Sequence, residues 1–88
     1  MSKSDQVLSG SVSTNSSTNV MINFESTVKH LSVKAVTQNA YVGFDTAANT
    51  DDALVETGNG WVNLMNTPCT KLYVLGAGSG TFYYIARR

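Results

Sequence analysis

The chain has 88 residues with six basic and six acidic side chains, so its formal net charge is zero. This length suits one domain near the lower limit for independent folding. The balanced charge and the lack of a basic stripe argue against a nucleic-acid partner. No run approaches the ~18 apolar residues of a membrane span. Ser, Thr and Asn number ten, ten and eight, a composition associated with strand-rich extracellular and virion proteins.

A core of this size supplies only about 3–5 kcal/mol, so such chains usually recruit a disulfide, a metal or a partner subunit. Cys69 is the single cysteine, which rules out an internal disulfide and favours a buried structural thiol. One cysteine and one histidine (His30) cannot supply the roughly four ligands of zinc. We therefore expect no metal or cofactor, and we expect stabilisation by homo-oligomerisation.

Residues 1–18 are polar and small, and we interpret them as an N-terminal arm that precedes a single β domain at 19–88. The arm either frays or pairs its segment 6–9 with an edge strand, of its own chain or of a neighbour. The first six residues lack the apolar stretch of a signal peptide, so we expect synthesis in a cytoplasm.

Alternating apolar residues predict strands over 19–24, 28–37 and 40–44. Gln38 and Asn39 form the turn between the last two strands, and Gly43 indicates a bulge or a close backbone approach. His30 falls on the polar side of its strand, where a solvated role is expected. The acidic stretch 45–52 resembles a calcium loop, but its position 3 is Ala47 and its position 6 is Thr50 in place of the glycine that such a loop needs.

Further strands are predicted over 53–57 and 61–64, separated by a tight turn at 58–60, and Pro68 then interrupts the chain. The end of the chain predicts a C-terminal hairpin, in which strands 71–75 and 81–86 flank a glycine-rich loop at 76–80. That loop lacks the Lys and Ser/Thr of a phosphate-binding loop. Both faces of the hairpin are apolar, so one of them needs a second cover.

No segment repeats apolar residues at helical spacing. Short strands separated by Gly, Asn and Asp turns predict an all-β fold: a small antiparallel sandwich or barrel of about seven to eight short strands. The sequence alone does not separate these two topologies.

No catalytic template fits, and we expect no enzymatic activity, because nothing in the sequence places His30 near a nucleophile and the acidic residues form no pair across a cleft. The aromatic residues are the candidates for interface or ligand contacts, although each of them could instead fill the core. These candidates are Trp61, Tyr41, Tyr73 and Tyr83.

From His30 onward the chain resembles the small β-sandwich proteins of tailed bacteriophage particles, which include capsid decoration (cement) and head or tail accessory proteins. The resemblance lies in the strand 31–35, the Tyr-Val-Gly-Phe-Asp stretch at 41–45, the acidic turn, the Gly-Trp turn at 60–61 and the two terminal strands. It implies a virion location, many copies per particle, self-assembly and docking on a larger capsid or tail protein. It carries over no catalytic residues.

Two functions remain open at this point. The first is a structural component of a bacteriophage particle. The second is a module that binds carbohydrate or a host surface through exposed aromatic residues, with glycan as its partner. Neither function involves a membrane or nucleic acid.

Overall fold

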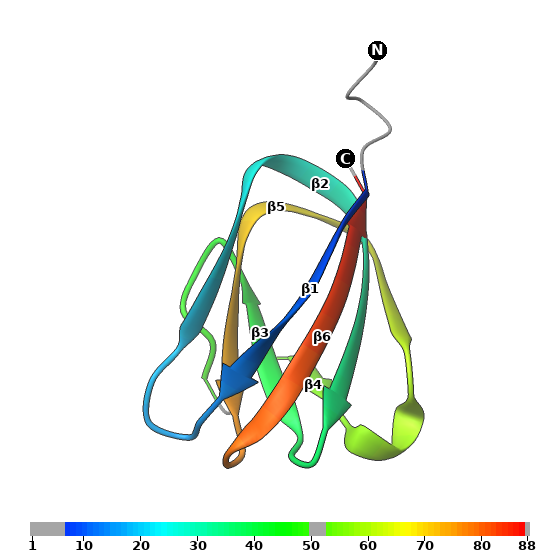
Figure 1. Cartoon of the computed structure of the whole chain (residues 1–88). Coiled ribbons are helices and arrows are strands. Elements are labelled where there is room, and N and C mark those ends of the chain that lie inside the picture. Colours follow the sequence, from blue (N-terminus) through cyan, green and yellow to red (C-terminus); the bar gives the residue numbers. More distant parts are fainter. Residues whose placement is uncertain (1–6, 50–52, 88) are drawn as a thin grey trace.

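The computed structural model describes residues 7–49 and 53–87, which form an all-β fold with one short 3₁₀ turn and no α-helix (Figure 1). This part of the chain confirms the predicted class, because all of its strand pairs are antiparallel. The elements are β1 (Val7–Thr14), β2 (Val20–Val36), β3 (Ala40–Phe44), β4 (Ala53–Val55), η1 (Thr57–Asn59), β5 (Val62–Gly76) and β6 (Gly80–Arg87).

The strands form one six-stranded sheet in the order β1-β6-β2-β5-β3-β4. Because β1 and β4 each have a single neighbour, this sheet is open and is not a closed barrel. Figure 1 shows that β2 and β5 arch over the top of the molecule, so that the sheet folds back on itself. We call β1, β6, residues 28–36 of β2 and residues 62–65 of β5 the front half-sheet. The back half-sheet contains residues 20–24 of β2, residues 69–76 of β5, and β3 and β4.

Unequal insertions in β2 and β5 produce the fold-over. The first insertion is in β2: between the pairs Asn23–Lys71 and Val28–Cys69, four residues of β2 (24–27) lie opposite a single residue of β5 (70). The second insertion is in β5: after the pair Val28–Cys69, three residues of β5 (66–68) lie opposite residue 29 of β2. Such bulges bend a strand while pairing continues on either side. Pro68 lies in the stretch that the pairing skips, so its missing N–H costs no ladder hydrogen bond.

This bend explains why the sheet has fewer than the seven to eight strands predicted. The strands expected over 19–24 and 28–37 join into β2, and those expected over 61–64 and 71–75 join into β5. Pro68 therefore marks a bend and does not end a strand.

The two predicted C-terminal strands and their glycine-rich connection are present, but β5 and β6 do not pair with each other. Each pairs with β2, and the connection crosses from the back half-sheet to the front one. Its glycines allow close packing: a Cβ at Gly76 would lie 2.7 Å from the Thr14 hydroxyl oxygen, and one at Gly80 would lie 2.8 Å from the Val36 carbonyl oxygen.

The described part of the predicted arm takes one of its two expected roles, because it pairs with a strand of its own chain. Residues 7–14 form β1, which pairs along its whole length with β6 of the same chain. The described part of the expected arm is thus an edge strand of the β domain, because its apolar residues Leu8 and Val12 pack against the core.

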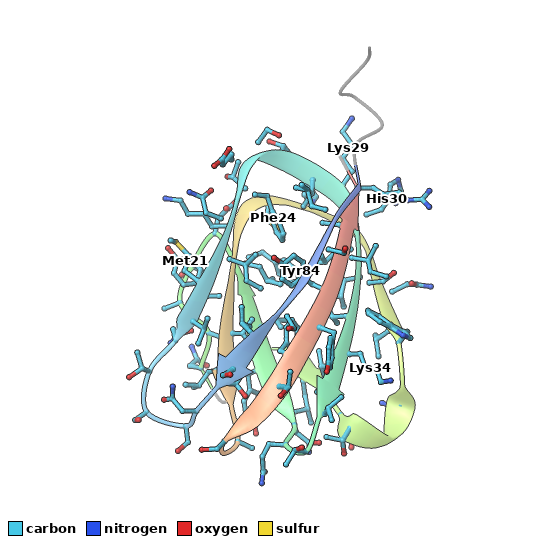
Figure 2. The ribbon with its side chains drawn as sticks, viewed as in Figure 1. Met21, Phe24, Lys29, His30, Lys34 and Tyr84 are labelled. Carbon is cyan, nitrogen blue, oxygen red and sulfur yellow. The ribbon has the colours of Figure 1, made fainter. Side chains whose placement is uncertain are left out.

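One core lies between the two half-sheets. Figure 2 shows Phe24 and Tyr84 in this interior, where their rings meet edge to face with centroids 5.9 Å apart. Phe82, Leu72, Val33 and Val74 are fully buried there. Because side chains alternate along a strand, each half-sheet keeps a second face that points to solvent. We call these surfaces the front face and the back face.

Candidate functional site

The structure divides the four predicted contact residues between the two outer faces. Trp61 and Tyr83 lie on the front face, with 47% and 39% of their surface exposed. Tyr41 and Tyr73 lie on the back face, where both are half-buried. None of the four belongs to the buried core, and the partly buried aromatic residues that pack against the core are Phe44 and Tyr84.

A shallow hollow of about 370 Å³ on the front face brings Trp61 and Tyr83 together. Its remaining lining comes from Ser9, Gly10, Ser11, Tyr84 and Ile85. Ile85 is 37% exposed, so the hollow presents two aromatic rings and one aliphatic side chain to solvent. The hydroxyl groups of the β1 serines border this apolar floor. The absence of a side chain at Gly10 makes room for the Tyr84 ring, because a Cβ would lie 2.8 Å from the Tyr84 hydroxyl oxygen.

A second hollow of about 430 Å³ adjoins the first and shares Ile85 with it. It is lined by His30, Leu31, Ser32, Asn63, Ile85 and Arg87. The Ser32 hydroxyl donates a hydrogen bond of 2.7 Å to Asn63 Oδ1, which leaves the amide nitrogen of Asn63 free to donate to a ligand. His30 is exposed here, as the alternation of its strand predicted.

The back face is largely apolar, with the exposed pair Asn23–Lys71 at one end of it. Strand pairing sets Met21 opposite Tyr73, and it sets Tyr41 between Leu54 and Leu75. Met21 and Leu54 are the most exposed of these, at 47% and 46%. Figure 2 shows Met21 on one outer side of the molecule and Lys34 and His30 on the other.

The loop after β3 borders the back face and is held by two polar residues. Asp45 Oδ1 accepts hydrogen bonds from the backbone N–H groups of Thr70 and Lys71 at 3.0 and 2.9 Å, and from the Thr70 hydroxyl at 3.1 Å. These donors lower the pKa of the Asp45 carboxyl group. Asn19 exchanges two hydrogen bonds with the backbone of Ala48. The acidic loop therefore uses Asp45 to bind the backbone of β5; residues 50–52 of the loop lie outside the described ranges.

Cys69 is buried opposite Val28, as expected for a structural thiol. Burial raises the pKa of this thiol to about 11, and the negative charge of Asp45 adds to the effect. The thiol is therefore protonated at neutral pH and is a poor nucleophile.

Within residues 7–49 and 53–87, no group of three His, Cys, Asp or Glu side chains is arranged to hold a metal ion. The same residues contain no helix with the length and apolar character needed to cross a bilayer. Comparison with protein-family models, curated proteins and solved structures found no match to this chain.

Sequence reasoning did not nominate Ile85, Met21 or Leu54, although all three are prominent on the outer faces. The signal for Ile85 was present, because the alternation of β6 places it beside Tyr83. The alternation of β2 gave the same signal for Met21, because it places Met21 on the face opposite Ile22 and Phe24. Leu54 carried no comparable signal, since an apolar residue in so short a strand fits the core equally well.

Proposed function

We propose that this protein is a structural, non-enzymatic component of a tailed-bacteriophage particle, of the capsid decoration or head–tail accessory type. It self-associates and docks in many copies on a larger virion protein. The resemblance of the sequence to such proteins supports this proposal. The main structural observation in its favour is the exposed apolar surface of the back face.

The back face has the composition of a protein interface. Protein interfaces are enriched in Tyr and Met and depleted in charged residues at their centre. The outward positions around Tyr41 and Tyr73 are occupied by Met21, Leu54 and Leu75, and the exposed pair Asn23–Lys71 lies at one end of this group. Burying such side chains gains roughly 25 cal/mol per Å² of apolar surface removed from water. We assign this face to contacts between copies of the chain, which would supplement the small core.

Sedimentation velocity tests the self-association. The wild type is expected to sediment as a defined oligomer, and the double variant Met21→Ser/Leu54→Ser is expected to shift toward monomer. The variant Ile85→Ser is the matched control, since it makes a similar change on the front face. If the wild type remained monomeric at high concentration, the assignment of the back face to self-association would be refuted.

The virion assignment needs a separate test. Quantitative mass spectrometry of gradient-purified particles, produced by the organism that encodes the chain, should detect it in many copies per particle. Its absence from the particles would refute the assignment.

A second candidate function has its own observation in its favour. Trp61 and Tyr83 line one hollow together with the hydroxyl-bearing residues Ser9 and Ser11, and aromatic rings bordered by hydrogen-bonding groups suit the C–H and O–H groups of sugars. On this basis the front face is a carbohydrate-binding surface. A glycan screen should then give binding that Trp61→Ala abolishes, whereas binding unaffected by the substitution would exclude this surface.

A further inference from the structure

We infer that the ligand of the front face is an acidic oligosaccharide, whose carboxylate pairs with Lys34 while its sugar rings contact Trp61 and Tyr83. The inference rests on the second candidate function. It adds that the ligand is negatively charged and that Lys34 recognises this charge.

The strand register places Lys34 between the two aromatic residues. Lys34 pairs directly with Tyr83 across β2 and β6. On the other side of β2, Val33 pairs with Val62, so continuing the antiparallel register by one residue brings Trp61 across from Lys34. Lys34 is half-buried and points to the outer side (Figure 2). From such a half-buried position a lysine can lay its alkyl stem along neighbouring apolar surface and keep its ammonium group in solvent.

The charge on this face is of one sign. The charged side chains at outward positions of β1, β6 and the second half of β2 are Lys34 and Arg87, and Arg87 pairs directly with the exposed His30. The acidic residues of the described ranges lie elsewhere, at the bend of β2 (Glu25) and in the segments after β3 and β4 (Asp45 and Glu56). Within these ranges the structure gives Lys34 no ion-pair partner. A chain with no net charge thus presents a cationic, aromatic surface, and this pattern complements an anion.

The neutral groups favour a sugar over other anions. The two hollows share Ile85 and together extend from Trp61 and Ser9 to Asn63 and Arg87, which provides room for more than one sugar ring. Serine hydroxyl groups and the free amide nitrogen of Asn63 suit the hydroxyl groups of a sugar. A nucleic acid would instead need a groove of cations that tracks its backbone, and this face offers only a few.

Titration of the ¹⁵N-labelled full chain, followed by NMR, tests the inference. The probes are a galacturonic acid tetramer, its fully methyl-esterified and therefore neutral form, a hyaluronan tetrasaccharide and sialyllactose. At least one acidic probe is expected to bind, with shifts confined to residues 9–11, 32–34, 61–63 and 83–85. If it is the galacturonic acid tetramer, it should bind at least about tenfold more tightly than its ester, as expected for a charge-assisted hydrogen bond.

The variant Lys34→Met removes the charge and keeps the stem, so it should abolish the preference for the acidic form. Lys71→Met is the matched control, because Lys71 is an exposed lysine of the back half-sheet; it should leave the preference unchanged. Equal affinity for acid and ester, with binding still lost in Trp61→Ala, would overturn the role of Lys34 and leave the neutral-sugar function standing. Failure of every acidic probe at millimolar concentration would also overturn the inference, as would tighter Lys34-dependent binding of a short oligothymidylate.

Discussion

Replacing Gly43 by alanine is expected to destabilise the fold by about 3–5 kcal/mol. A Cβ at this position would lie 2.3 Å from the Thr46 carbonyl oxygen and 3.0 Å from the Ala48 nitrogen. Both contacts are backbone atoms, so relief requires the loop to lift. Lifting would break the two hydrogen bonds between Asn19 and Ala48, at about 1 kcal/mol each, and residual overpacking adds about 1–3 kcal/mol.

Urea denaturation of the purified variants measures this effect. Gly58→Ala is the matched control, because a Cβ there meets nothing within 4 Å; it should change the free energy of unfolding by no more than about 1 kcal/mol. If the loop lifts, adding Asn19→Ala to Gly43→Ala should cost little more, since the same hydrogen bonds are already lost. A loss below about 1 kcal/mol for Gly43→Ala, or full additivity of the two substitutions, would refute this reasoning.

Two further predictions concern groups with shifted pKa values. The Cys69 thiol, whose pKa is about 11, should resist a disulfide reagent at pH 8 in the native protein and react at once in urea. Because its folded pKa lies above the reference value of 9.0, its contribution to stability should be lost as the pH rises from 9 toward 11. Asp45 has a lowered pKa, so its contribution should be present above the ordinary carboxyl pKa and lost as the pH falls through its folded value. At neutral pH, Asp45→Asn should lower the urea midpoint less than Asp45→Ala, because asparagine keeps an acceptor oxygen and tolerates the positive φ of 59° at this position.

The strands themselves could be read from the sequence, and their joining could not. Alternation located β3 to the residue and sorted the side chains of β2 and β6 into two faces. The polar residues Glu25, Ser26 and Thr27 break this alternation, so the sequence indicates a strand end where the backbone continues through a bend with Glu25 at φ 68°. Pro68 misleads in the same way, because a bulged stretch tolerates a proline that a regular ladder would exclude.

The glycine-rich connection at 76–80 shows the limit of local rules. Short glycine loops between two strands are typical of hairpins, yet here β2 separates β5 from β6. Burial of apolar surface outweighs the local preference of the loop for a hairpin. Both terminal strands have an apolar inner face, and pairing each of them with β2 places Leu72 and Phe82 in the same core. Long-range packing of this kind cannot be predicted from the residues of the loop.

The candidate site was partly predictable for a related reason. Trp61 and Tyr83 could be nominated because large aromatic residues beside polar turns often mark binding surfaces. Their meeting on one face, with Lys34 between them, depends on the order β6-β2-β5. A single sequence does not determine strand order, so Tyr41 and Tyr73 could not be separated from the other two.

The two outer faces should act independently, because the whole core lies between them and the half-sheets of a sandwich pack about 10 Å apart. Substitutions at this separation with no shared partners have nearly additive effects. We therefore expect Met21→Ser/Leu54→Ser to reduce the oligomer and to keep sugar binding. Trp61→Ala should do the opposite, with sedimentation velocity and NMR titration as the two readouts. If either variant lost both properties while remaining folded by circular dichroism, oligomerisation and ligand binding would share one surface, and the assignment of the back face to self-association would be wrong.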